Sequence, residues 1–127
     1  MERERKYRAK RNDMFDLPFK YFECFQDIAN LRDEAKYYEL WSEFTGYKDK
    51  NKNEIYEGDI IGDWNEIDGK MEQSKQTVYF DEMLGQWMLD NSLRQDRTLS
   101  YSLFSELQDF EYEVIGNVYE NADLLGS

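Results

Sequence analysis

Histidine is absent from this 127-residue sequence, and cysteine and proline occur only once each. Without histidine the chain cannot form a Ser-His-Asp triad or a Cys-His dyad, and it lacks the commonest protein ligand of transition metals. It also contains neither the phosphate-binding pattern GxxxxGKS/T nor the dinucleotide-binding pattern GxGxxG. Because these absences remove the commonest recognisable catalytic classes, we predict that the protein is not an enzyme.

The single cysteine and the lack of long apolar runs bear on the compartment. Cys24 cannot form an intramolecular disulfide or a cysteine-only zinc site, which favours a reducing compartment. It lies among aromatic residues with no histidine to activate it, so we predict a buried and inert thiol. No segment approaches the roughly 20 apolar residues of a membrane span, and the N-terminus lacks the apolar stretch of a signal peptide. We therefore expect a soluble cytoplasmic protein with no membrane partner.

Aromatic residues, in contrast, are abundant. They make up 17% of the chain, and charged residues make up 35%. Disordered chains are poor in aromatic residues, so this composition predicts a folded domain with an aromatic-rich core and a very polar surface. The length suits one domain, and no repeat or linker interrupts it. We predict a single domain over residues 1–127, with an N-terminal extension over 1–44 and a barrel-like part over 45–127.

The net charge of -12 is unevenly distributed. Residues 1–20 contain seven basic and four acidic residues, whereas the remaining chain contains nine basic and 24 acidic ones. The basic start is either a solvated strand paired with the acidic body or an arm that reaches an acidic partner or another subunit. The overall sign opposes direct binding to nucleic acid. The tyrosines could form a stacking platform for single strands, but their acidic neighbours favour packing in a core or a subunit interface.

The pattern along the chain is that of a mainly β protein with little helix. We predict strands over 38–44, 54–56, 76–80, 86–89 and 112–119, with a bulge or bend at Gly116. Residues 4–9 fit an edge strand, and residues 19–25 fit either a strand or irregular aromatic packing. A short helix from Ile28 to about Lys36, capped by Asp27, and helical turns within 99–107 and 121–125 complete the pattern. Asp68-Gly69 predicts a hairpin, with Trp64 packed near an exposed tip.

The segment Thr45–Ile61 contains two turns between apolar residues. In the first turn, Asn51 or Asn53 is expected to adopt the positive φ, because asparagine tolerates left-handed backbone. The second turn, at Gly58, precedes an apolar strand. This order is similar to the start of small SH3-type barrels, so we predict an SH3-like small barrel preceded by additional N-terminal β or irregular structure.

Five acids lie close together in this part of the sequence: Asp49, Glu54, Glu57, Asp59 and Asp63. They could bind Mg²⁺ or Ca²⁺, or form a two-carboxylate hydrolase site. The spacing of a calcium-binding EF-hand is missing, however, and acids cluster readily in a chain that contains 28 of them. We favour solvated turn residues, with Asp59 capping its own turn, and we assign no catalytic, cofactor-binding or metal-binding residue.

Residues 43–61 (EFTGYKDKNKNEIYEGDII) and 112–121 (YEVIGNVYEN) resemble the two hallmark segments of the YopX family of phage and prophage proteins. Residues 5–9 (RKYRA) resemble its basic-aromatic opening, and residues 78–81 lie where its central strand is expected. Two positions depart from the family pattern: Lys10 stands where tryptophan is usual, and Lys52 stands where glycine is often found in the first turn. The resemblance implies an SH3-like barrel, a viral or prophage origin and self-association, but it implies no activity.

Together these observations favour an uncharacterised phage or prophage accessory protein that acts by binding or self-assembly in the bacterial cytoplasm. A homo-oligomer is the expected state, and a host or phage protein is left open as a further partner. One alternative is an acidic DNA mimic that occupies a host nucleic-acid-binding protein, for which the acidic body would provide the charge. The other is a carboxylate-metal hydrolase that uses the acids between Asp49 and Asp63.

Overall fold

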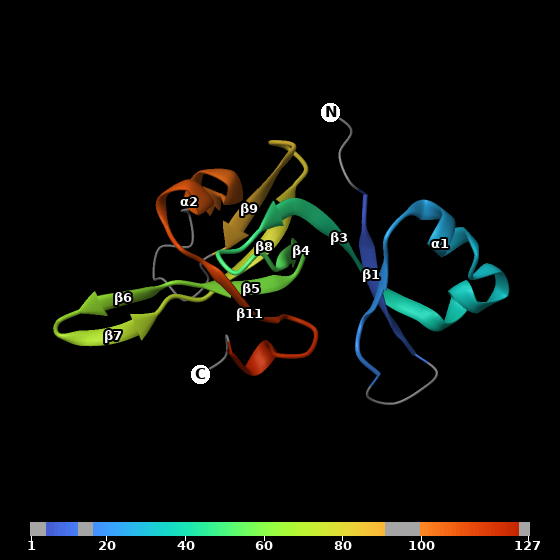
Figure 1. Cartoon of the computed structure of the whole chain (residues 1–127), viewed down its shortest axis with the longest axis horizontal. Coiled ribbons are helices and arrows are strands. Elements are labelled where there is room, and N and C mark those ends of the chain that lie inside the picture. The colour runs from blue at the N-terminus through green and yellow to red at the C-terminus, as the bar shows by residue number, and fades with distance from the viewer. Residues whose placement is uncertain (1–4, 13–16, 91–99, 125–127) are drawn as a thin grey trace.

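The computed structural model describes residues 5–12, 17–90 and 100–124, apart from the side chains of Asn65, Ile67 and Ser100. Two antiparallel sheets lie side by side and are linked by one long strand, and a two-stranded hairpin projects from the second sheet (Figure 1). None of the helices in these residues is both long and apolar enough to cross a membrane.

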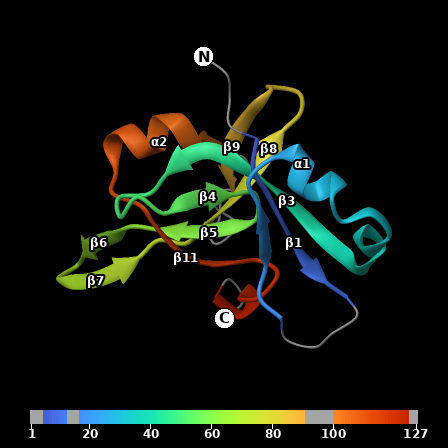
Figure 2. The same cartoon turned by 45° about the vertical axis from the view of Figure 1, so that its right-hand side comes forward.

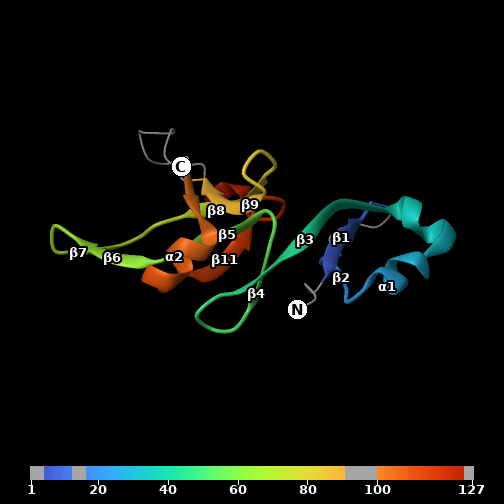
Figure 3. The same ribbon diagram turned by 90° about the horizontal axis from the view of Figure 1, so that it is seen from above.

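The first sheet has four strands in the order β2-β1-β3-β4. They are β1 (Tyr7–Arg11), β2 (Lys20–Phe22), β3 (Tyr38–Lys48) and β4 (Glu54–Tyr56). A short helix, α1 (Phe25–Ala29), and a 3₁₀ helix, η1 (Arg32–Tyr37), connect β2 to β3. We call β1, β2, α1, η1 and residues 38–43 of β3 the N-terminal lobe, which stands apart from the second sheet in Figure 3.

The second sheet has five strands in the order β10-β9-β8-β5-β11. They are β5 (Asp59–Gly62), β8 (Gln76–Asp81), β9 (Gln86–Asp90), β10 (Ser100–Ser102) and β11 (Glu113–Asn117). Helix α2 (Leu103–Asp109) follows β10, and the 3₁₀ helix η2 (Ala122–Leu124) follows β11. The Ser102 hydroxyl accepts a hydrogen bond from the Ser105 amide and so caps α2.

Strands β6 (Trp64–Ile67) and β7 (Lys70–Gln73) form the projecting hairpin, which we call the arm. Its turn contains Asp68 and Gly69, both with positive φ (52° and 80°), as the Asp-Gly signal predicts. The arm pairs only within itself in the described residues and extends away from the body in Figures 1 and 2.

Each sheet has its own apolar core. The core beside the second sheet also includes residues of β4 and α2, and its buried members are Ile55, Ile61, Val78, Trp87, Leu89, Leu103 and Tyr112. In the N-terminal lobe they are Ala9, Phe22, Leu31 and Tyr38. Strand β3 runs without interruption from the lobe to the second core, so the predicted division between residues 44 and 45 falls inside a strand.

The predicted SH3-like barrel is not confirmed, whereas the mainly β class is. In the described residues the five-stranded sheet is open, because its edge strands β10 and β11 are not paired with each other. Turn and strand signals are local, but closure depends on pairing between strands far apart in the sequence. The predicted bulge at Gly116 is confirmed, because the register between β11 and β5 shifts between Val114 and Gly116.

Three predictions for the N-terminal segment are wrong. Strand β1 is not an edge strand, because it lies between β2 and β3. Phe25 begins α1 instead of continuing β2. The predicted helix from Ile28 is divided into α1 and η1, since Arg32 has a φ of 49° and left-handed backbone cannot continue a right-handed helix. Asp27 therefore lies inside α1 and does not cap it.

The positive φ in the first turn belongs to Lys52 (68°), and not to Asn51 or Asn53. The carboxylate of Asp49 accepts the backbone N–H of Asn51 at 2.9 Å and of Asn53 at 2.8 Å. These two bonds leave the left-handed conformation to the residue between them. Lys52 is also the position where the family often has glycine, which adopts positive φ without steric cost.

Candidate functional site

A buried ion pair joins the two sheets. Arg8 of β1 donates from Nη2 to Asp59 Oδ1 of β5 at 2.6 Å, and these residues are only 4% and 1% exposed. Arg8 Nε donates to the hydroxyl of Ser42 at 2.8 Å, and Asp59 Oδ2 accepts the Tyr56 amide at 2.7 Å. Buried charges are tolerated when they are paired and hydrogen-bonded in this way. We call Arg8, Ser42, Tyr56 and Asp59 the joint.

Aromatic rings enclose the guanidinium group of Arg8. Its Cζ lies 4.5 Å from the ring centroid of Phe19 and 4.9 Å from that of Tyr56. A planar guanidinium can stack on aromatic faces while its edge binds a carboxylate, and a lysine ammonium cannot do both. Burial raises the pKa of Asp59, whereas the positive charge of Arg8 and the Tyr56 amide act in the opposite direction.

The C-terminal segment packs against the same place. The ring of Tyr119 meets that of Phe19 edge-on at 5.8 Å, and Lys10 Nζ lies 2.9 Å from Glu120 Oε2. Gly58 has a φ of 85°, and a Cβ there would lie 2.7 Å from Tyr119 Cε2. The close approach of this ring therefore requires glycine at position 58.

The clustered acids have structural partners. Asp49 is buried, and besides the two turn amides its carboxylate accepts the Val114 amide at 2.9 Å. Asp59 does cap its own turn, as predicted, but it also binds Arg8. Glu54 Oε2 lies 2.7 Å from Lys6 Nζ. The interpretation as solvated turn residues is thus wrong for Asp49 and Asp59, because the sequence does not show which acids meet distant donors.

No three histidine, cysteine or acidic side chains converge to hold a metal ion in the parts of the chain that the structure describes. At Asp63 it is the backbone that forms a hydrogen bond, since its N–H donates to the hydroxyl of Ser74 at 3.1 Å. Burial raises the pKa of Glu57, and the neighbouring charge of Glu43 adds to the effect. Asp49, Glu54 and Asp59 therefore support the fold through these partners.

A pocket of about 330 Å³ lies beside the joint. Its wall includes Arg8, Tyr21, Tyr56 and Val114. The hydroxyl of Tyr56 is buried without a hydrogen-bond partner, and burial raises its pKa far above the ordinary value, so the phenol stays protonated. A protonated phenol is a hydrogen-bond donor and not a base, so Tyr56 offers this pocket a donor near neutral pH.

Cys24 is exposed, so the prediction of a buried thiol is wrong. It lies between the end of β2 and the start of α1, where its neighbours Glu23 and Phe25 are also exposed. Phe22, two residues earlier, occupies the core of the lobe instead. A short aromatic-rich run does not reveal which of its residues points inward.

The arm carries apolar side chains that face solvent. Trp64 is 50% exposed and Met71 is 61% exposed. Trp64 pairs with Gln73 and Glu66 with Met71, so these four side chains share one face of the hairpin. The prediction of a packed tryptophan near the tip is therefore wrong, because Trp64 begins β6 and remains half exposed.

Comparison with known proteins places the chain in a family. The family model described as YopX protein matches residues 5–126. The protein belongs to the YopX family. No curated protein matches it. Among solved structures, the crystal structure of protein EF1440 from Enterococcus faecalis is similar, with a TM-score of 0.57, 21% sequence identity, and coverage of 95% of this chain and 97% of that chain.

In this YopX-family protein, the segments that carry the family resemblance meet at one place. Arg8 lies in the opening segment, Asp59 lies in the first hallmark segment, and Tyr119 and Glu120 lie in the second. The three segments that carry the family resemblance therefore supply residues at or beside the joint between the two sheets. Sequence reasoning missed the joint because its ion pair spans 51 residues, although the basic N-terminal segment beside an acidic body was a usable signal.

Proposed function

We propose that this protein is a phage or prophage accessory protein that acts by binding, and that its first partner is a second copy of the same chain. The observation that carries the proposal is the arm, a two-stranded hairpin that projects from the body with Trp64 and Met71 exposed on one face. An isolated two-stranded hairpin is marginally stable in water, so a covering partner would stabilise it. Exposed tryptophan and methionine are enriched at protein interfaces.

The buried acids support binding over catalysis. Asp49 and Asp59 are engaged by backbone amides and by Arg8, so the strongest candidates for a hydrolytic site already have structural partners. Among the residues that the structure describes, Trp64 and Met71 of the arm stay 50% and 61% exposed. Its two strands also present unpaired edges, of the kind that another chain can extend.

Light scattering coupled to size-exclusion chromatography tests the proposal. The wild-type protein is expected to run at a mass above one chain, which increases with concentration. The variant Trp64→Ala with Met71→Ala is expected to run as a single chain, because it loses the exposed apolar face of the arm.

A matched control is Met83→Ala with Leu84→Ala, which removes two other exposed apolar side chains (97% and 59% exposed) in the turn between β8 and β9. This variant should assemble as the wild type does. A wild-type protein that stays a single chain at high concentration, or an arm variant that assembles normally, would contradict the proposal.

A further inference from the structure

The end of the molecule opposite the arm contains a hollow of about 480 Å³. It lies in the N-terminal lobe between β2, α1 and η1. Phe22 and Leu31, which belong to the lobe's core, form its apolar part, and Lys20, Arg32, Asp27 and Glu34 provide charged groups. This volume is within the range of roughly 300–1,000 Å³ that ligand pockets occupy.

Lys20 and Arg32 form no ion pair in the part of the chain that the structure describes, although the carboxylates of Asp27 and Glu34 line the same hollow. Lys20 Nζ lies 5.7 Å from the ring centroid of Phe22 and 6.0 Å from that of Tyr38, and it forms no ion pair in the described residues. Arg32 is exposed, forms no hydrogen bond or ion pair there, and has the strained φ of 49°. Strained backbone is found where the surroundings or a function require it.

The arm has the complementary groups. Trp64, Glu66 and Met71 lie on one face of the hairpin, and Glu66 pairs directly with Met71 across the two strands. Glu66 and Asp68 are exposed and have no ion-pair partner in the part of the chain that the structure describes. Tryptophan is the aromatic residue that attracts a lysine or guanidinium cation most strongly.

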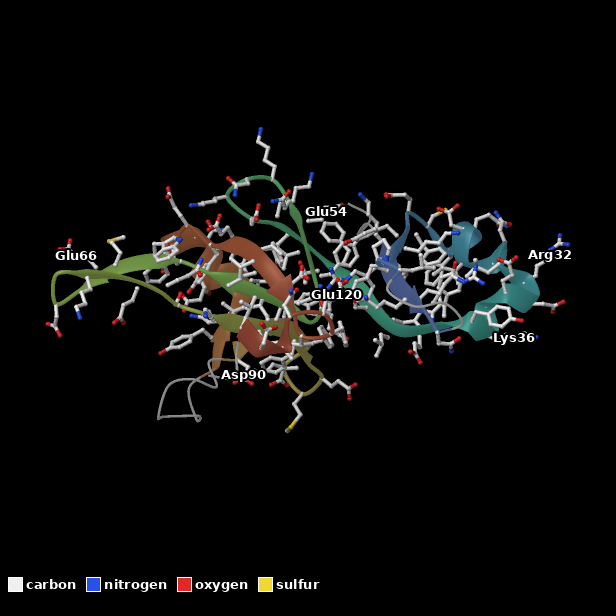
Figure 4. All side chains as sticks on the ribbon, turned by 90° about the horizontal axis from the view of Figure 1, so that it is seen from below. Arg32, Lys36, Glu54, Glu66, Asp90 and Glu120 are labelled. Carbon is white, nitrogen blue, oxygen red and sulfur yellow. The ribbon has the colours of Figure 1, made fainter. Side chains whose placement is uncertain are left out.

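The arm and the hollow lie at opposite ends of the chain. Figure 4 shows Glu66 at one end and Arg32 and Lys36 at the other. Figures 1 and 3 show the same separation between β6–β7 and α1. One molecule therefore presents both halves of a contact that it cannot form with itself.

We infer that the arm of one copy inserts Trp64 and Met71 into the hollow of the next copy, with Glu66 and Asp68 facing Lys20 and Arg32. This inference rests on the proposed self-association through the arm and names its receiving surface. Because two different surfaces meet, the contact is head-to-tail, and repetition closes a ring or extends a filament.

Two variants that each lose one surface test the head-to-tail contact. The arm variant is Trp64→Ala with Met71→Ala, and the hollow variant is Lys20→Glu with Arg32→Glu. Each should run as a single chain by light scattering. An equimolar mixture should form a complex of two chains and no larger species, because one intact arm and one intact hollow remain. Lys48→Glu with Lys50→Glu, which changes the charge equally at two exposed residues of the β3–β4 region, should assemble normally.

The outcomes separate the two proposals. An arm variant that still assembles contradicts the proposed function. A monomeric arm variant together with a hollow variant that assembles like the wild type contradicts only the head-to-tail contact, as does a mixture that stays at the mass of one chain.

A photo-cross-linking amino acid in place of Met71 gives a measurement that does not depend on the folding of the hollow variant. Cross-links between chains are expected within residues 20–34. Cross-links from residue 71 to the arm of the second copy would overturn the inference.

Discussion

At the scale of single residues, this protein uses carboxylates to hold backbone in place. Asp49 accepts three backbone amides, and one of them, from Val114, comes from a strand 65 residues away. Each hydrogen bond to a charged group contributes roughly 1.5–3 kcal/mol, so Asp49 fixes both its own turn and the position of β11. This arrangement strains the backbone of Lys52, which must adopt the left-handed conformation.

Replacing Lys52 with glycine should therefore stabilise the protein. Left-handed backbone costs a residue with a Cβ roughly 1–2 kcal/mol, and the extra flexibility of glycine in the unfolded chain offsets roughly 0.5–1 kcal/mol of that gain. The expected increase in the free energy of unfolding is up to about 1 kcal/mol, measured by urea denaturation. Asn51→Gly is the matched control and should lower stability, because φ at position 51 is not positive. Equal effects of the two changes would contradict this assignment of strain.

Glu57 gives a pH dependence with a defined sign. Burial raises its folded pKa above the ordinary value of 4.5, so the folded protein gains its proton at a higher pH than the unfolded chain. The charged form is unfavourable at neutral pH, and this penalty is relieved as the pH falls through the raised pKa towards 4.5.

Glu57→Gln should raise the melting temperature at pH 7, and its advantage over the wild type should shrink as the pH approaches 4.5. Thermal melts at several pH values measure this. The comparison variant is Glu120→Gln, because a hydrogen bond from Asn117 lowers the pKa of Glu120 and the charged form is stabilising. That variant should be less stable than the wild type at pH 7. If both substitutions lowered the melting temperature at pH 7, burial of the Glu57 carboxylate would not be the dominant effect at that residue.

At the scale of elements, the arm differs from the β8–β9 hairpin of the second sheet. Strands β8 and β9 pack Val78 and Leu89 into a core, whereas Trp64 and Met71 of the arm face solvent. Local stability depends on buried apolar contacts as much as on backbone pairing. The arm therefore has the pairing of a hairpin without the packing that stabilises one.

Hydrogen exchange should show this difference directly. In the Trp64→Ala, Met71→Ala variant, amides of β6 and β7 are expected to exchange much faster than those of β8 and β9, as followed by mass spectrometry of peptides. In the assembled wild-type protein, protection of the arm should increase because a second copy covers it. Protection of the arm equal to that of β8 and β9 in the single chain would contradict the interpretation.

At the scale of the whole molecule, two small cores act as one fold because a buried ion pair connects them. Arg8 belongs to the N-terminal lobe, and Asp59 belongs to the second sheet. Neither core is large, so the joint and the continuous strand β3 determine how the two parts are held together. Removing one partner of a buried ion pair leaves an uncompensated charge, which is more costly than removing both.

Arg8→Met is expected to lower the free energy of unfolding by roughly 3–5 kcal/mol, because Asp59 remains buried without its partner. Adding Asp59→Asn should restore part of that loss, since asparagine carries no charge and still offers an oxygen to the Tyr56 amide. Urea denaturation of the wild type, both single variants and the double variant measures the coupling. A double variant no more stable than Arg8→Met would show that the charge of Asp59 is not the source of the loss.

The sequence alone determined the properties that depend on composition and on neighbouring residues. The mainly β class, the Asp68-Gly69 hairpin, the turn at Gly58, the bulge at Gly116 and membership of the YopX family were all predictable, because turn chemistry and strand patterns are local. Only the tertiary structure decided which acid meets Arg8, that β1 is a central strand, and that the sheets stay open in the described residues. These features rest on pairing between residues that are distant in the sequence, such as the 51 positions between Arg8 and Asp59, and no local pattern specifies such a pairing. The exposure of Trp64 was decided in the same way, since the tertiary arrangement leaves the arm without a layer to pack against.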